Sequence, residues 1–174
     1  MIRILGIDPG SQVTGYGLID ADGGRAVCVT FGCIRPRGDS LARRLHGIQA
    51  ALEALVDEHR PQEAAVERVY VHRNVESALK LGQARGAALA AVAGRGVPVH
   101  EYTPAQIKQA VTGRGNAAKV QVQHMVKALL GLHRPPAADA ADALAMALCH
   151  GHLRQTLARL PAGTRRGRAR GRRR

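Results

Sequence analysis

The chain has 174 residues, with 26 Lys and Arg against 13 Asp and Glu, so its formal net charge is +13. This length predicts one domain with a substantial core. No apolar run is long enough to predict a membrane-spanning helix. The three cysteines have neither an even count nor metal-ligand spacing, and MIRILGID reaches an acidic residue too early for a signal peptide. We therefore expect a reduced, cytoplasmic setting.

The basic charge is concentrated at the end of the chain but is not confined to it. Seven arginines lie in residues 163–174, and the rest of the chain also carries more basic than acidic residues. A basic body suggests a polyanionic partner, most often nucleic acid, although an arginine-rich solvated face fits the composition equally well. We expect residues 156–174 to form a disordered basic tail that adds non-specific phosphate affinity.

The first third of the chain predicts strands followed by a helix. Apolar segments typical of strands occupy residues 2–8, 16–20 and 26–34. Because their connections are short, we expect a three-strand antiparallel meander. A helix is predicted from Ser40, with Asp39 as its candidate N-cap and Pro61 as its stop, since apolar residues recur there at alternating intervals of four and three.

The remainder alternates strands with helices. Strands are predicted at 63–69 and 97–102, and helices at 75–92, from Pro104 after an N-cap at Thr103, at 117–131 and at 137–152. Strands that are entered through helical crossovers lie parallel to the first strand. The predicted fold is therefore α/β, with a mixed five-stranded sheet of an antiparallel meander plus two parallel strands, flanked by helices.

Four carboxylates are predicted to meet at one edge of this sheet. Asp8 ends the first strand, Glu67 lies near the end of the fourth, and Asp139 and Asp142 lie one turn apart on the last helix. Four buried negative charges need compensation, and oxygen-only ligands select Mg²⁺ or Mn²⁺. Two such ions, typically ~3.5–4 Å apart, can promote in-line phosphodiester displacement. With the basic body, this indicates a metal-dependent nuclease.

Each carboxylate also has a simpler interpretation. Asp139 and Asp142 can interact favourably with a helix macrodipole, which contributes ~0.3–1 kcal/mol each. Asp8 stands before Pro9 and Gly10, where aspartate is a common turn residue, and Glu67 can pair with a nearby arginine. The nuclease interpretation therefore depends on the convergence of all four and not on any one of them.

Several longer motifs carry a resemblance. The segments that show it are GIDPGSQVTGYG (6–17), ESALKLGQARG (76–86), KVQVQHMV (119–126) and ADAADALA (138–145). In their order and spacing they resemble the RuvC family of bacterial Holliday junction resolvases, within the retroviral integrase and RNase H superfamily. The resemblance implies an RNase H-like nuclease domain over residues 1–155. It also implies that the four acidic metal ligands are Asp8, Glu67, Asp139 and Asp142.

The resemblance implies further chemistry. The family uses Mg²⁺, with two ions per active site expected and Mn²⁺ as a substitute. Lys108 and Lys119 match functional lysines, which we interpret as phosphate-holding groups, with Lys119 also a catalytic candidate that stabilises transition-state charge. Tyr70 replaces the expected Phe that stacks at the opened junction centre and retains a stacking face. Arg73 is a candidate DNA contact in the same loop.

The resemblance also implies partners. The family acts as a homodimer on four-way junction DNA, nicking two opposing strands symmetrically in recombination and repair, and it works with the RuvA and RuvB branch-migration proteins. Gly82 and Gly86 lie on one helix face and suit either a tight dimer seam or packing inside one subunit. No membrane partner is expected.

Other interpretations compete with a resolvase. GIDPGS followed by TG also resembles the first phosphate loop of actin-like ATPases and sugar kinases, but those need a duplicated domain for which this chain has no room. A related nuclease acting on RNA and a non-catalytic junction-binding protein are the remaining alternatives. The histidines invite a metal interpretation too, yet Asp139 and His150 lie roughly 16 Å apart along one helix, so one ion cannot bind both.

Overall fold

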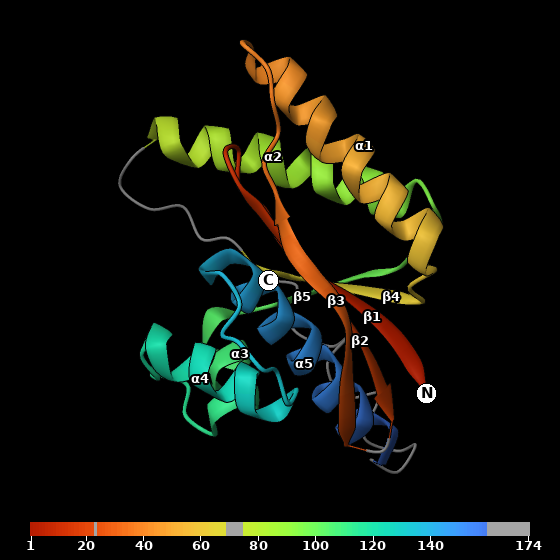
Figure 1. The fold of residues 1–174 in the computed structure, drawn as a ribbon, viewed down its shortest axis with the longest axis vertical. Coiled ribbons are helices and arrows are strands. Elements are labelled where there is room, and N and C mark those ends of the chain that lie inside the picture. Colours follow the sequence, from red (N-terminus) through yellow and green to blue (C-terminus); the bar gives the residue numbers. More distant parts are fainter. Residues whose placement is uncertain (23, 69–74, 160–174) are drawn as a thin grey trace, which may run out of the picture.

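A five-stranded sheet lies between two layers of helices in the computed structural model, which describes residues 1–22, 24–68 and 75–159 (Figure 1). The strands are β1 (Ile2–Asp8), β2 (Thr14–Asp22), β3 (Arg25–Ile34), β4 (Glu63–Glu67) and β5 (Val99–Tyr102). The helices are α1 (Leu41–His59), α2 (Val75–Ala93), α3 (Pro104–Thr112), α4 (Lys119–Leu129) and α5 (Ala138–Arg159).

The strand order is β3-β2-β1-β4-β5, with β1, β2 and β3 antiparallel and with β4 parallel to both β1 and β5. This confirms the predicted mixed α/β sheet. β2 is longer at both ends than the apolar pattern predicted, because it pairs with β1 from Gly15 to Ala21 and with β3 from Thr14 opposite Ile34 to Asp22 opposite Arg25. Ladder pairing therefore extends the strand into residues that are not themselves apolar.

The N-cap predicted for α1 was wrong by one residue. Asp39 does not cap the helix; the Ser40 side chain does, accepting a hydrogen bond from the Arg43 backbone N–H at 3.3 Å. Both residue types are good N-caps, so the position is decided by which backbone is extended immediately before the first helical turn. At the start of α3 the prediction was confirmed, since Thr103 and Gln106 form a capping box ahead of the helix.

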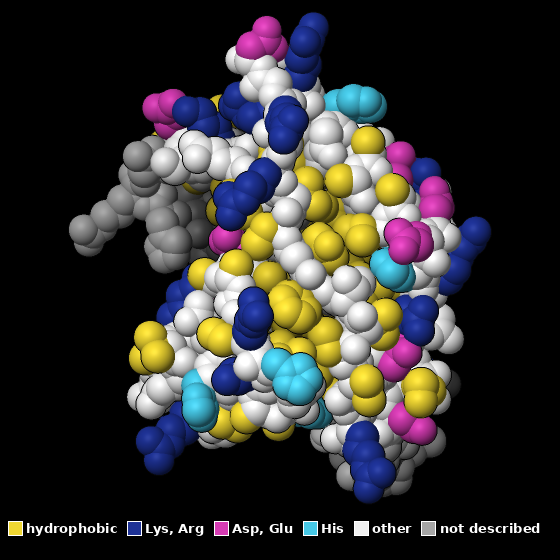
Figure 2. Space-filling model, viewed as in Figure 1, with side chains coloured by type: hydrophobic (Ala, Val, Ile, Leu, Met, Phe, Trp, Pro, Cys, Tyr) yellow, Lys and Arg dark blue, Asp and Glu magenta, His cyan; other side chains and the backbone are white. Residues whose placement is uncertain are grey.

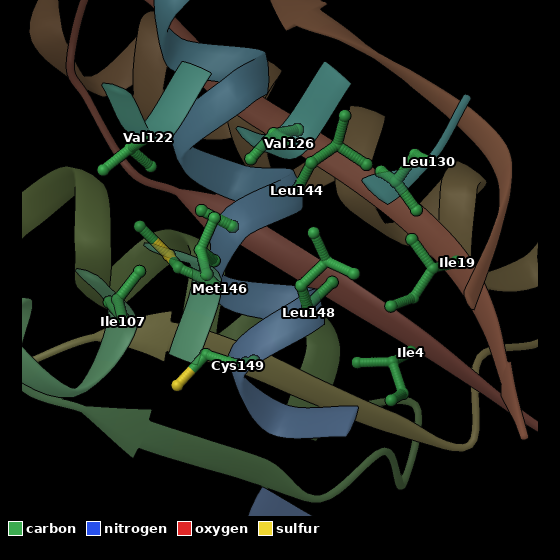
Figure 3. Packing of buried hydrophobic residues seen from close by; sticks show 14 of the residues in the cluster. Ile4, Ile19, Ile107, Val122, Val126, Leu130, Leu144, Met146, Leu148 and Cys149 are labelled. Atoms are coloured by element: carbon green, nitrogen blue, oxygen red, sulfur yellow. The ribbon is translucent and has the colours of Figure 1, made fainter. Parts of the chain in front are cut away.

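The helices divide between the two faces of the sheet. α1 and α2 cover one face, whereas α3, α4 and α5 lie on the other (Figure 1). α5 is buried on nearly all sides from Ala140 to His150 because it lies between the sheet and the α3–α4 pair, and Figure 3 shows Leu144, Met146 and Leu148 packed among side chains of these neighbours. Within the described ranges, no helix is both long and apolar enough to cross a membrane.

Glycines in β1 and β2 bring α5 unusually close to the sheet. A Cβ at Gly6 would lie 1.9 Å from the Ala143 carbonyl oxygen, and one at Gly15 would lie 2.0 Å from the Asp139 carbonyl oxygen. Because real Cβ atoms do not approach that closely, no other residue fits at either position without a shift of the helix. The backbone of α5 thus rests directly on the backbone of β1 and β2.

We predict that Gly15→Ala lowers the free energy of unfolding by about 1–3 kcal/mol, because α5 must move away from β2 to accept the methyl group. Chemical denaturation measures this. Gly47→Ala is the matched control, since the Cβ there would make only ordinary contact, 3.4 Å from Pro36, inside helix α1. Equal effects of the two substitutions would show that α5 does not require the close approach.

Candidate active site

Strand pairing brings the first two carboxylates together. Asp8 is the last residue of β1 and Glu67 the last residue of β4, and these parallel strands pair up to Ile7 opposite Val66. Both acidic residues therefore leave the sheet at the same edge. This edge, at the C-terminal ends of parallel strands, is where α/β folds commonly place their sites.

The first turn of α5 brings two more carboxylates to that edge. Gly15 pairs with Asp8 in the sheet, and the Asp139 backbone lies against Gly15. Asp142 is one turn further along the same helix. The close packing of α5 on β2 therefore places Asp139 and Asp142 beside Asp8, and the structure brings all four predicted carboxylates together.

The electrostatics of Asp8 show the cost of this arrangement. Burial is the largest cause that raises the pKa of Asp8, and the charges of Asp142, Asp139 and Glu67 raise it further, to about 7. Lys119 acts in the opposite direction but does not offset these effects. At neutral pH a substantial fraction of Asp8 is thus protonated unless further positive charge enters the cluster.

Two lysines supply part of that positive charge. Lys119 Nζ lies 2.6 Å from Asp142 Oδ2, and this contact raises the pKa of Lys119. The pKa of Glu67 is raised, first by burial and then by Asp142, while Lys108 and Lys119 lower it. Both predicted lysines are therefore close enough to act on the acidic cluster.

A cleft of about 280 Å³ opens beside these charges. Glu67 and Asp142 line it together with both lysines. Its other walls are apolar and come from α3, α4 and α5, namely Pro104, Ile107, Val122, Ala145 and Met146. Apolar walls exclude water and strengthen electrostatic interactions inside a cleft.

The donor set of the acidic cluster fits divalent metal ions. Asp8, Glu67, Asp139 and Asp142 offer only carboxylate oxygens, which suit hard cations. Their mutual repulsion, visible in the raised pKa values of Asp8 and Glu67, would be relieved by bound positive charge. These residues are therefore suited to a divalent cation centre.

Two contacts of Arg68 fix the position of the backbone where the chain leaves the sheet after Glu67. After Glu67, the Arg68 backbone N–H donates to the Tyr102 carbonyl oxygen at 2.7 Å, and the Arg68 side chain lies 3.8 Å from the Glu101 carboxylate. Glu101 also binds Arg85 of α2 at 2.6 Å. Sequence reasoning missed Glu101, because nothing in VHEY separates it from an ordinary exposed strand residue. Residues 69–74, which include the predicted DNA contacts at positions 70 and 73, lie outside the described residues.

We predict that Asp8→Asn stabilises the metal-free protein, and more so at alkaline than at acidic pH. Since the folded-state pKa lies above the unfolded-state value, the stabilising contribution of this carboxyl is present at low pH and is lost as pH rises to about 7. With EDTA at about pH 8, denaturation should show a gain on the order of 2 kcal/mol, which shrinks as the pH falls below about 7 and approaches zero near pH 4.

Asp39→Asn provides the control for this prediction. Its carboxylate is 83% exposed and lies 3.7 Å from Arg43, so its removal should have little effect at either pH. An equal gain from Asp8→Asn at both pH values would contradict the charge repulsion at the cluster.

Comparison with known proteins gives the family. The family model for crossover junction endodeoxyribonuclease RuvC matches residues 4–150. The protein of that name from Marinobacter nauticus is 56% identical over 160 residues, which is 92% of this chain and 91% of the relative. The one from Halorhodospira halophila is 61% identical over 155 residues, which is 88% of this chain and 92% of the relative.

Solved structures agree with the family model. T. thermophilus RuvC in complex with Holliday junction substrate matches with a TM-score of 0.84 at 36% identity, covering 90% of this chain and 96% of the other. The yeast mitochondrial Holliday junction resolvase Ydc2, at 11% identity and a TM-score of 0.63, shares the fold and covers 89% of this chain and 81% of its own. The chain therefore has the RNase H-like fold of these resolvases and belongs to the RuvC family.

Proposed function

We propose that this protein is a crossover junction endodeoxyribonuclease, which resolves Holliday junctions by symmetric, metal-dependent nicking of two opposing DNA strands in recombination and repair. The observation that carries the proposal is the convergence of four carboxylates and two lysines at one edge of a RuvC-family fold. A protein that only bound junctions would gain nothing from these carboxylates, since unneutralised they repel DNA.

The surface charge supports a DNA substrate. Lys and Arg side chains are spread over the face shown in Figure 2, from its top to its bottom, while acidic side chains gather mainly along one side. With a net charge of +13, the protein attracts a phosphate backbone over a long range. We infer that the basic segment at residues 156–174, whose first four residues complete α5, adds phosphate contacts that are not specific to any sequence.

We assign the metal as Mg²⁺, with two ions per active site held by Asp8, Glu67, Asp139 and Asp142, and with Mn²⁺ as a substitute. Bound there, the ions would supply Lewis-acid polarisation of the scissile phosphodiester and activation of water. Lys108 and Lys119 line the adjoining cleft and hold the phosphate, and Lys119 is the catalytic candidate nearest the cluster. Its ammonium would stabilise charge on the phosphoryl oxygens in the transition state.

The segment after Glu67 is assigned to the junction centre. We propose that Tyr70 stacks on an unpaired base and that Arg73 contacts the DNA backbone. The anchoring of Arg68 to Tyr102 and Glu101 supports this, because it fixes where the segment starts, directly beside the acidic cluster. RuvA and RuvB as partners, and a cytoplasmic location with the chromosome, complete the proposal by family membership.

A homodimer through α2 fits the exposed face of that helix. Val75 and Leu79 are 78% and 61% exposed, and they share a helix face with Gly82 and Gly86. No other part of the described chain lies within 4 Å of a Cβ placed at either glycine. The two glycines therefore pack against no other described element of their own subunit, and we propose the dimer seam as their role.

The central prediction uses a synthetic four-way junction and a linear duplex of the same sequence, with Mg²⁺ or with EDTA. We expect paired nicks in the junction alone, and only with Mg²⁺. Asp8→Asn should slow cleavage by about 10³-fold or more, because several kcal/mol of metal stabilisation are lost, while junction binding persists. Gel analysis of end-labelled strands measures both cleavage and binding.

Other outcomes of that assay are equally informative. Junction-selective binding without nicks, across several junction sequences and with Mn²⁺ as well, would identify a binding protein and overturn the nuclease. Full cleavage by Asp8→Asn would remove Asp8 from the mechanism. Asp39→Asn, which alters an exposed carboxylate that does not act on the cluster, should cleave like the parent.

For the dimer, we predict that Gly82→Leu shifts the protein towards monomer and reduces paired nicking to single nicks, because a bulky side chain prevents close approach of two α2 helices. Light scattering at micromolar concentration gives the mass. Ala50→Leu, on an exposed position of α1, is the control and should leave the mass unchanged. An unchanged mass for Gly82→Leu would place the seam elsewhere.

A further inference from the structure

A second group of potential metal ligands lies away from the acidic cluster. One nitrogen or oxygen atom from each of Glu63, His100 and His150 lies within 4.8 Å of the others. Along α5, His150 is eleven residues beyond Asp139, which is about 16 Å. Along β4, Glu63 is four residues before Glu67, which is about 13 Å. The two groups therefore cannot share an ion.

The three side chains come from three elements and face one another. Glu63 begins β4 and His100 lies on the neighbouring β5, and alternation along these strands turns both towards α5. The ring of His150, which is only 2% exposed, stacks on His100 with centroids 4.4 Å apart. His150 Nε2 contacts the Glu63 carboxylate, and His100 Nε2 lies 3.9 Å from the same oxygen.

Outer partners already orient these groups. The Tyr102 hydroxyl lies 2.5 Å from His150 Nδ1, and Arg154 Nε donates to the other Glu63 oxygen at 3.1 Å. In the metal-free protein the Glu63 carboxylate accepts from His150 Nε2–H, so His150 Nδ1 accepts from the Tyr102 hydroxyl. A cation bound at Nε2 would select the other tautomer, in which Nδ1–H donates to the Tyr102 oxygen and the Nε2 lone pair faces the ion. Hydrogen bonds of this kind, from the far side of a ligand, fix its tautomer and orientation in metal sites.

We propose that Glu63, His100 and His150 bind a zinc ion, forming an accessory site that joins β4 and β5 to α5. Two imidazoles and one carboxylate suit Zn²⁺, whereas Mg²⁺ prefers oxygen ligands only. Metal–ligand bonds of about 2.0–2.2 Å require the ligand atoms to lie somewhat closer together than the 3.9 Å between His100 Nε2 and the Glu63 oxygen. The His100 side chain is 43% exposed and has room to turn inward. Solvent occupies the remaining position.

The consequence of the site is mechanical. An ion that binds the folded chain but not the unfolded chain stabilises the fold. Here it would fix the second half of α5 against the sheet, and this helix carries Asp139 and Asp142 at its other end. The proposal does not depend on nuclease activity.

Calorimetric titration with ZnCl₂ tests the proposal. The titration uses the full-length Asp139→Asn/Asp142→Asn protein after EDTA treatment and desalting. These two substitutions remove most of the competing zinc binding at the acidic cluster. We expect one saturable zinc ion per chain and a higher thermal midpoint with zinc. His100→Ala or Glu63→Gln added to this background should weaken zinc affinity by about tenfold or more and remove the thermal shift. Co²⁺ should give visible absorption that His100→Ala abolishes.

Controls separate this site from general histidine binding. His124→Ala removes an exposed histidine on α4 that is outside the group and should leave zinc affinity unchanged. Circular dichroism verifies that each variant folds. If His100→Ala fails to fold, the isosteric Glu63→Gln variant still tests the proposal. Absence of saturable zinc binding, or equal affinity in the parent and in both ligand variants, would overturn the site.

Discussion

The close contact between α5 and the sheet is the constraint on which the rest of the structure depends. Side chains normally separate the backbone of a helix from that of a sheet, but Gly6 and Gly15 have none, so the α5 backbone rests on β1 and β2. Direct backbone contact leaves α5 less freedom to shift relative to the sheet than side-chain packing would allow. Because Gly15 pairs with Asp8 and touches Asp139, one backbone contact fixes the spacing between strand and helix carboxylates. The GIDPG and TGYG motifs are therefore packing motifs as well as site motifs.

That rigidity holds together groups that repel one another. Burial and three neighbouring carboxylates raise the pKa of Asp8 to about 7, so the fold holds the cluster against an electrostatic cost that the apolar packing of α5 offsets. Lys119 compensates only part of the charge, and it does so from an exposed position at the start of α4. A divalent cation that took over this compensation would release the Lys119 ammonium from Asp142. The same lysine would then be available to a phosphate in the adjoining cleft.

The sequence predicted what periodicity and strand order determine. The five strands, the antiparallel meander and the parallel direction of the last two strands follow from apolar runs and from the kinds of connection between them, as the structure confirms. The exact start of α1 was harder to predict, because Asp39 and Ser40 are both good N-cap residues and only the backbone geometry shows which of them caps the helix. Whether Gly82 and Gly86 pack inside the subunit could not be read from their spacing, because it depends on which face of α2 meets α1. The group at Glu63, His100 and His150 was missed, because its prediction requires knowing how α5 is rotated and where it crosses the sheet, and no local sequence pattern encodes either.

α5 is thus held along its length by two different kinds of contact. Near Asp139 the contact is backbone against backbone, which tolerates no added atom. Near His150 it is polar, with Tyr102, Glu63 and Arg154 bonded around one buried ring, and such bonds can rearrange. From Leu144 to Cys149 the helix is apolar on all sides and gains its stability from burial, which has no directional preference. Burial alone would let the helix slide or rotate, so the two ends set its position. The placement of Asp139 and Asp142 is therefore decided partly by residues a dozen positions away, at the far end of the same helix.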